Sequence, residues 1–241
     1  FVLIVRFSGS RIRQDSEPSD KAHQMNSPQT RHRLLDAAER LFAQHGIDAT
    51  SLRAITAEAG TNLASVHYHF GSKEALVDAV IARRLGPINR ERLRLLDKAE
   101  AAAGEGPAEL DAIVEAFVEP ALRLVRDPDH GGTDFVRLMA QVHGGPDEQK
   151  QRLMNQFGEI LDRFGAALGR ALPHLGASDL CWRFFFLIGS MLVALGHGDI
   201  LQSHSGGACD PSDVKGTLRH LVAFVSAGLR APAVEAMGGT T

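Results

Sequence analysis

The sequence predicts an all-α fold, with a small helical head followed by a larger helical bundle. Apolar residues recur at spacings of three and four along most of the chain from residue 27 onward. Proline and glycine divide this pattern into segments, and no alternating stretch of strand length occurs. With 241 residues, 44% of them hydrophobic, the chain is long enough to bury a core.

The first 26 residues are predicted to form a disordered extension. Residues 1–7 are apolar, but they are too few for a signal peptide and no small-residue cleavage site follows them. Residues 8–24 are polar and charged, with Ser, Asp, Glu and Pro prominent, a composition typical of disorder. We therefore expect Met25 to be the true start of translation.

A first helix is expected over residues 28–45. Pro28 suits its first position, because the N–H that proline lacks has no helical partner there. Apolar residues recur as far as Phe42, and Gly46 supplies a left-handed stop. A second, short helix is expected over residues 51–59, beginning after Thr50 or Ser51, both of which are good caps.

A third helix is expected over residues 63–70 after the cap Asn62, and a fourth begins after the cap Ser72. Gly86-Pro87 is expected to break the fourth helix. The stretch 197–209, rich in Gly, Ser and His, is predicted to be a loop. The remaining helices are expected at about 88–103, 108–126, 133–143, 147–171, 178–196 and 211–229.

These breaks predict a head over residues 27–85, a body over 86–231 and a disordered tail over 232–241. From Met25 to Leu85 there are seven Lys/Arg and six Asp/Glu, whereas from Gly86 onward there are 15 and 20. The formal net charge is -3. This balance excludes a uniformly basic nucleic-acid-binding protein, and the asymmetry between the two parts is weak.

Two cysteines, Cys181 and Cys209, are too few for a disulfide framework or a four-ligand zinc site. Cys181 lies in an apolar stretch and is expected in the core, which fits a reducing cytoplasm. That stretch, Leu180 to Gly196, has 17 residues and contains Arg183. A membrane-spanning helix needs about 20 apolar residues, so we interpret the stretch as a buried core or interface helix and expect no membrane association.

The helices over residues 51–59 and 63–70, joined by a three-residue turn, are predicted to form a helix-turn-helix. At 100° per residue, Leu63, Val66 and Phe70 form an apolar seam. The opposite side, with Ala64, Ser65 and Tyr68, is small, polar and aromatic, which suits a helix in the major groove. From spacing alone, an ordinary polar surface helix remains an equal alternative.

Longer motifs resolve this alternative. The runs Ser51–Ile55, Ala59–Asn62 and Tyr68–Leu76, together with Leu35–Gly46, resemble the DNA-binding signature of the TetR family in order and spacing. The resemblance covers about residues 30–80. It implies a homodimeric bacterial transcription regulator, most often a repressor, that binds palindromic double-stranded operator DNA and is released by a small apolar effector.

The resemblance places Tyr68, His69 and Lys73 where the family contacts phosphates. It places Ser51 and Arg53 where the second helix meets the DNA backbone. The start and exposed edge of the recognition helix are then Asn62, Leu63, Ala64, Ser65 and His67. Since many members carry a polar or basic residue at the position of Leu63, we expect few direct base contacts.

Members of the family pair this head with a helical domain that binds a ligand and dimerises through its last two helices. Residues 180–196 are apolar almost all round and must be covered on more than one face. The candidate interface residues are Phe184, Leu187, Met191, Leu218, Leu221, Val222 and Val225. Candidates for an apolar pocket, each of which taken singly is more simply interpreted as ordinary core, are Phe117, Leu124, Phe135, Met139, Phe157, Phe164 and Phe185.

Three short segments are similar to the PsrA-like branch of the family, which responds to fatty acids or their acyl-CoA esters. They are Asn62-Leu63-Ala64, Gly71-Ser72-Lys73 and Trp182-Arg183-Phe184. The similarity implies an acyl chain or an acyl-CoA as the effector.

No metal, cofactor or enzyme activity is expected. His67 and His69 lie about 200° apart on a helix and cannot bind one ion from the same face. His197 and His204, with Cys209 and Asp210, are more simply interpreted as a polar loop. No nucleophile elbow, phosphate-binding loop or dinucleotide fingerprint is present. The alternative is a helical enzyme or carrier that uses the apolar pocket of the body.

Overall fold

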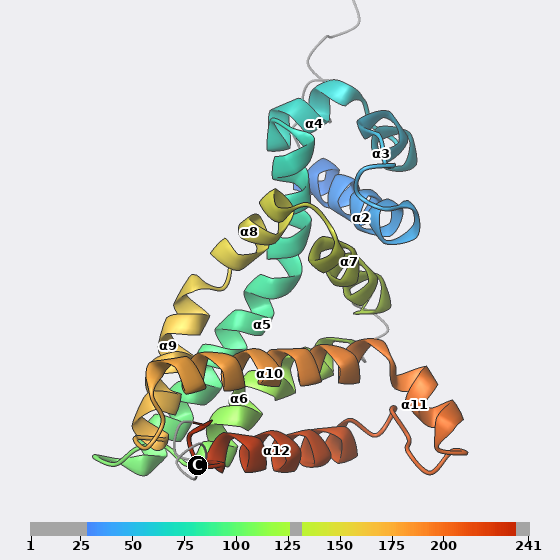
Figure 1. Ribbon diagram of the computed structural model, residues 1–241. Helices are drawn as coiled ribbons and strands as arrows, with labels where there is room; N and C mark the ends of the chain where they lie inside the picture. Colours follow the sequence, from blue (N-terminus) through green and yellow to red (C-terminus); the bar gives the residue numbers. More distant parts are fainter. Residues whose placement is uncertain (1–27, 126–131, 235–241) are drawn as a thin grey trace, which may run out of the picture.

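The computed structural model describes residues 28–125 and 132–234 (Figure 1). Every regular element in these ranges is an α-helix and none is a strand, which confirms the predicted all-α class. The predicted disordered extension, Met25 included, lies outside the described residues, as do residues 235–241 of the predicted tail.

Four helices build the head: α2 (Pro28–His45), α3 (Leu52–Glu58), α4 (Leu63–Phe70) and the first turns of α5 (Lys73–Ala103). The last three each begin after a predicted cap, whose side-chain oxygen accepts a backbone N–H of the first turn. Their apolar faces meet in one core, whose fully buried members include Phe42, Ile55, Val66 and Leu76.

Helix α5 continues through Gly86-Pro87, so the predicted break there is wrong. Pro87 lacks the N–H that would bond the carbonyl of Arg83, a loss of about 3 kcal/mol in a helix interior. Burying one Leu or Ile side chain contributes about 1.5–3 kcal/mol. Packing on both sides of the proline therefore outweighs the lost hydrogen bond; the buried residues of this stretch include Leu85, Ile88, Arg92 and Leu96.

The body surrounds the second half of α5 (Figure 1). Helices α10 and α12 pack side by side at its base, and α6 packs along both α5 and α12. The helices of the body are α6 (Leu110–Val125), α7 (Gly132–Gly144), α8 (Asp147–Asn155), α9 (Gly158–Ala171), α10 (Ala177–Gly196), α11 (Gly198–His204) and α12 (Val214–Arg230).

The body departs from the sequence expectations in three places. The single helix predicted over 147–171 is two helices, because the N–H groups of Gln156 and Phe157 turn back to carbonyls three residues earlier. The predicted loop over 197–209 contains the short helix α11. Cys181 is exposed on α10 and not in the core, because that helix leaves much of its apolar surface uncovered within one chain.

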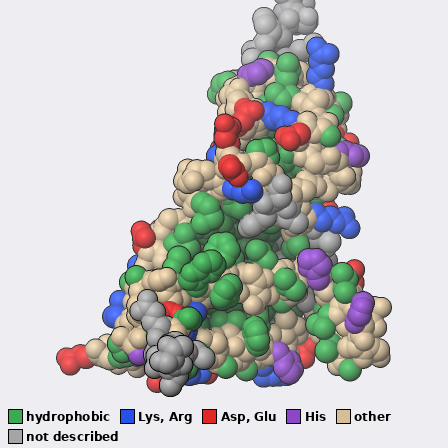
Figure 2. All heavy atoms as spheres, viewed as in Figure 1, with side chains coloured by type: hydrophobic (Ala, Val, Ile, Leu, Met, Phe, Trp, Pro, Cys, Tyr) green, Lys and Arg blue, Asp and Glu red, His purple; other side chains and the backbone are tan. Residues whose placement is uncertain are grey.

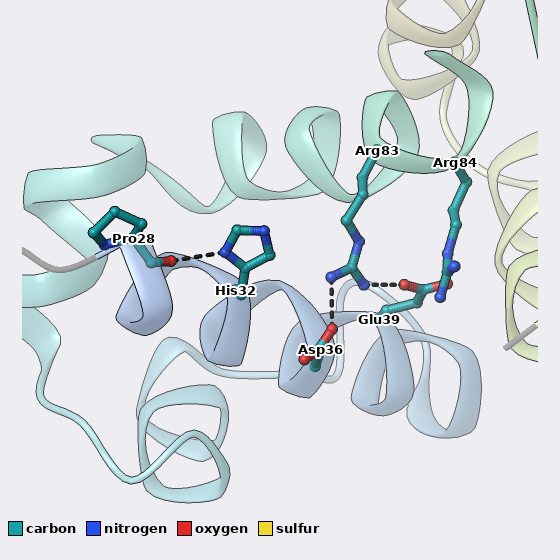
Figure 3. A network of polar contacts seen from close by, with 6 residues as sticks. All are labelled: Pro28, His32, Asp36, Glu39, Arg83 and Arg84. Carbon is teal, nitrogen blue, oxygen red and sulfur yellow. Dashed lines mark hydrogen bonds and ion pairs between the residues drawn. The ribbon is translucent and has the colours of Figure 1, made fainter. Parts of the chain in front are cut away.

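A buried carboxylate joins α2 to α5 (Figure 3). The side chain of Glu39 is 4% exposed and pairs with both Arg83 and Arg84, the latter at 2.7 Å between Nε and Oε1. Arg83 also pairs with Asp36 at 2.6 Å. Since the Glu39 carboxylate and the guanidinium groups of Arg83 and Arg84 are desolvated together, each depends on the others for its polar partners. We call Asp36, Glu39, Arg83 and Arg84 the α2–α5 clamp.

We expect Glu39→Gln to lower the free energy of unfolding by on the order of 3 kcal/mol, because it leaves the largely buried guanidinium of Arg84 without a counter-charge and leaves Arg83 with only the exposed carboxylate of Asp36. The matched control is Glu58→Gln, which removes an exposed ion pair with Arg40 and is expected to cost about 0–1 kcal/mol. Urea titration followed by circular dichroism measures both. Equal effects of the two variants would contradict the stabilising role of the clamp.

Candidate DNA-binding surface and ligand cavity

Helices α3 and α4 form a helix-turn-helix at the far end of the head from α10 and α12 (Figure 1). Val66 is fully buried, whereas Leu63 and Tyr68 are 39% and 64% exposed. The outer surface of α4 therefore carries small, apolar and aromatic groups. With Asn62, Ala64 and His67 also exposed, this surface can approach a nucleic-acid groove closely.

Ser65 does not belong to that outer surface. It is fully buried, and its hydroxyl accepts a hydrogen bond from Thr61 and lies 3.3 Å from Oδ1 of Asn62. The Ser65 N–H donates to the same Asn62 oxygen. The helical wheel placed Ser65 outward, but at the first turn the capping bonds draw its hydroxyl toward the turn, so the prediction that Ser65 lies on the outer side of α4 is wrong.

Of the remaining candidates, Ser51, Arg53 and Lys73 lie on or at the start of the helices next to α4 and His69 lies on α4 itself. Lys73 begins α5, and its ammonium lies 3.3 Å from the carbonyl of Asp48. Ser51 is exposed and caps α3 by accepting the N–H of Ala54. Arg53 is exposed and forms no ion pair within the described part of the chain. His69 is half-buried beside Tyr68 and Phe70, with ring centroids 5.1 and 6.1 Å apart.

One exposed cation near α4 was missed from the sequence. The guanidinium carbon of Arg31, on α2, lies 5.3 Å from the ring centroid of Phe70 at the end of α4, within the range of a cation–π contact. The packing of α2 against α4 creates this neighbourhood, and no local sequence pattern reveals it.

Four acidic groups of the head form ion pairs, whereas Asp48 and Glu74 lie near Lys73. Asp36 and Glu39 belong to the α2–α5 clamp, and Glu58 and Asp78 pair with Arg40 and Arg152. The slight excess of positive charge in the head is therefore concentrated on cations that lack carboxylate partners in the described residues, Arg31 and Arg53 among them. This distribution attracts a polyanion more strongly than the net charge of the head suggests.

The body encloses a cavity of about 290 Å³ with a mainly apolar wall, bounded by parts of α5 to α10. Four of the seven predicted pocket residues line it: Phe117, Phe135, Met139 and Phe157. Leu124 does not line it, and Phe164 is fully buried core beneath Phe117. Phe185 is 66% exposed on the outside of α10, because it follows Phe184 by one residue and points to another side of the helix.

Arg92 is a cavity residue that sequence reasoning missed. It is 2% exposed, and its guanidinium lies over the ring of Phe117 at 4.1 Å from the centroid. Nε donates to the Phe117 carbonyl at 2.7 Å, and NH1 lies 3.2 Å from Oδ1 of Asn89. Burial lowers the pKa of Arg92 to about 9, so the group still carries its charge at pH 7.

The surface formed by α10 and α12 exposes large apolar side chains, and Figure 2 shows such side chains gathered over the region of α10. Six of the seven predicted interface residues instead face the protomer's own core: Phe184, Leu187, Met191, Leu218, Leu221 and Val225. Val222 is half-buried. The exposed members are Trp182, Phe185, Phe186, Val193 and Phe224, which we call the aromatic face. The sequence showed that α10 is apolar on all sides but not which side packs inward.

By length and composition α10 could cross a membrane, and 11% of its most apolar window is buried. Its Arg183, however, donates to the carbonyls of Leu229 and Ala231 at 3.0 and 2.6 Å and to that of Pro232 at 2.6 Å. This arginine thus satisfies carbonyl groups at the carboxyl end of α12, as expected of a helix packed within a helical bundle.

Helix α8 and the turn after it lie between the cavity and the head. Leu153, Met154 and Phe157 line the cavity. On the other side, Gln149 bonds to Asp48 in the head at 3.4 Å. Arg152 and Gln156 approach Asp78 of α5 at 3.5 and 3.3 Å. A shift of α8 would therefore change contacts at both sites.

Within the described residues, no group of His, Cys, Asp and Glu side chains could hold a metal ion. His67 donates from Nδ1 to the carbonyl of Gly71 at 3.0 Å, and His204 bonds within α11.

Two family models match the chain. Residues 34–80 match the model described as bacterial regulatory proteins, tetR family, and residues 115–228 match the tetracyclin repressor-like C-terminal domain. The transcriptional repressor Rv3405c of Mycobacterium tuberculosis is 34% identical over 158 residues, 63% of this chain and 71% of that protein. The nicotine-responsive repressor HdnoR of Paenarthrobacter nicotinovorans is 31% identical over 111 residues, 42% of this chain and 57% of that protein.

Solved structures show the same fold. A putative transcriptional regulator from Pseudomonas aeruginosa PAO1 aligns with a TM-score of 0.58 at 18% identity, over 83% of this chain and 91% of that one. The TetR-family regulator SCO4454 of Streptomyces coelicolor aligns at 0.54 and 22% identity, over 84% and 97%. Because the head, the body and the relatives agree, the chain belongs to the TetR family of bacterial transcription regulators.

Proposed function

We propose that the protein is a homodimeric repressor that binds palindromic double-stranded operator DNA through α4 and is released by a small apolar effector in the body. The observation that carries the proposal is the exposed outer surface of α4, rimmed by cations, on a helix-turn-helix of the TetR family. Its repressor relatives in Mycobacterium and Paenarthrobacter support the direction of regulation.

In this proposal Tyr68, Lys73, Arg53 and Ser51 hold the DNA backbone. A phosphate seated at the start of α5 would meet the positive end of the helix dipole together with the Lys73 ammonium. Leu63 and Ala64 would approach base edges by apolar contact, and His67 Nε2, which has no partner in the described residues, would supply a polar group. This composition favours affinity from phosphate contacts over base readout.

The dimer would form through the aromatic face. A face with several exposed aromatic side chains is costly in water and typical of an interface. Helices α10 and α12 of two chains related by a twofold axis would form a four-helix contact. Both heads would then lie on the same side of the dimer, where they can meet the two half-sites of a palindrome.

The effector would occupy the cavity beside α5, and an acyl chain or acyl-CoA fits its apolar wall. Entry of a ligand against Met154 and Phe157 would displace α8. Through Gln149 and Arg152 that displacement would reach Asp48 and Asp78. The spacing of the two α4 helices in the dimer would then change, since the head follows the start of α5.

We expect Tyr68→Ala and Lys73→Ala to weaken binding to operator and unrelated DNA alike, because both residues would contact phosphates. For Lys73→Ala the slope of log affinity against log salt should fall by about 1. Fluorescence anisotropy with DNA from upstream of the protein's own gene, at several salt concentrations, measures this. Lys98→Ala, which removes an exposed lysine of the body, is the matched control; if Tyr68→Ala and Lys73→Ala both bind as the control does, the DNA face is assigned wrongly.

We expect the wild-type protein to have about twice the 26.0 kDa mass of one chain in sedimentation or light-scattering measurements, and Phe185→Asp to have the mass of a single chain. The introduced carboxylate would have to be buried without a partner at the interface. Tyr68→Ala, an equally exposed aromatic residue on the head, should keep the dimer mass. A dimeric Phe185→Asp protein would rule out the aromatic face as the interface.

A further inference from the structure

Arg92 is unusual for the wall of an apolar cavity. Among the described residues that line the cavity, only Arg92 and His197 are titratable, and neither Asp nor Glu is present. Arg92 forms no ion pair in the described part of the chain, and burial alone accounts for the lowering of its pKa. A buried charge without a counter-charge is costly, and buried arginines normally face a carboxylate or a phosphate.

The hydrogen bonds of Arg92 leave much of its donor capacity unused. Guanidinium has five N–H groups. One donates to the Phe117 carbonyl and one reaches Asn89 at 3.2 Å, while NH2 meets only the sulfur of Met191 at 3.5 Å, a weak acceptor. One face of the group is covered by the Phe117 ring, so the remaining donors lie along the edge of the guanidinium.

Arg92 also belongs to the buried part of the cavity lining. It is 2% exposed, whereas Met154 is 41% exposed and His197 is exposed as well. The mouth is therefore near the end of α10, and the charge is deep inside. The end of a ligand that contacts Arg92 would therefore enter the cavity first, and the opposite end would stay near the mouth.

We propose that the cavity binds a free organic carboxylate with an apolar tail, whose carboxylate pairs with the buried Arg92 and whose tail extends toward α10. The inference rests on the proposed function only in taking this ligand as the effector. A carboxylate would accept the unused guanidinium donors and supply the missing counter-charge. An acyl-CoA ester would leave its nucleotide at the mouth and place an uncharged methyl end against Arg92, so the free acid fits better.

The size of the cavity suggests a probe. At about 30 Å³ for each water-sized group, 290 Å³ holds roughly ten such groups. Octanoate has about this many heavy atoms. 1-Octanol has the same chain length without the charge, and octanoyl-CoA has the same tail without the free carboxylate.

The test is calorimetric titration of the full-length protein with octanoate, 1-octanol and octanoyl-CoA at pH 7.5. We expect octanoate to bind at least about tenfold more tightly than either of the others. Arg92→Met should abolish this preference and leave 1-octanol binding within about threefold of wild type. Arg90→Met, an exposed arginine of the same helix, should retain it. Arg92→Gln, which can still donate to the Phe117 carbonyl, is the second variant if Arg92→Met fails to fold.

An Arg92 with a purely structural role would give a different result. Its loss would change the unfolding midpoint while the preference for octanoate over 1-octanol stayed unchanged, or no preference would exist in the wild type. Either result overturns the inference, as does tighter binding of octanoyl-CoA that persists in Arg92→Gln. Since these titrations contain no DNA, they fail or succeed independently of the proposed DNA binding.

Discussion

Helix α5 crosses from the head into the body without interruption, and the α2–α5 clamp holds α2 against it. The Glu39 carboxylate is buried between Arg83 and Arg84, so α2 cannot move relative to α5 without exposing or unpairing three charges. Arg92, nine residues after Arg83 on the same helix, lies in the wall of the cavity. One rigid element therefore contributes to both the DNA-binding surface and the ligand cavity.

The clamp also shapes the electrostatics of the head. It pairs the carboxylates of Asp36 and Glu39 with arginines of α5. Arg31 and Arg53 remain exposed without carboxylate partners in the described residues. A chain with a net charge of -3 can in this way present a DNA-binding surface, because the field near a phosphate depends on nearby groups more than on the total.

The sequence predicted what local chemistry determines. The capping residues Ser51, Asn62 and Ser72 marked the helices of the head correctly, since each cap is satisfied within its own first turn. Predictions that depended on which side of a helix packs inward were weaker. Phe184 was expected at the interface but is buried, and Phe185 was expected in the pocket but is exposed. A helix that is apolar all round carries no periodic signal to orient it.

The remaining errors and omissions depend on tertiary packing, which the sequence does not show. Burial of apolar side chains before and after Pro87 keeps α5 continuous, whereas a local rule predicted a break there. Arg92 follows Leu85 and Ile88 at the spacing of the buried stripe of α5, and a charged residue in such a stripe was the signal that could have revealed it. Arg31 had no local signal, because its neighbour Phe70 lies on another helix.

We propose that occupancy of the cavity sets the spacing of the two α4 helices in the dimer. Pulsed electron–electron double resonance measures the distance between the two heads directly. A nitroxide is attached to Ala57→Cys of α3, and the two exposed cysteines are replaced by serine. Operator DNA should hold the heads at a spacing that matches half-sites one helical turn apart, about 34–36 Å, and saturating octanoate should shift the distance distribution away from the DNA-bound one. An octanoate-saturated dimer that keeps the DNA-bound distribution would contradict the account.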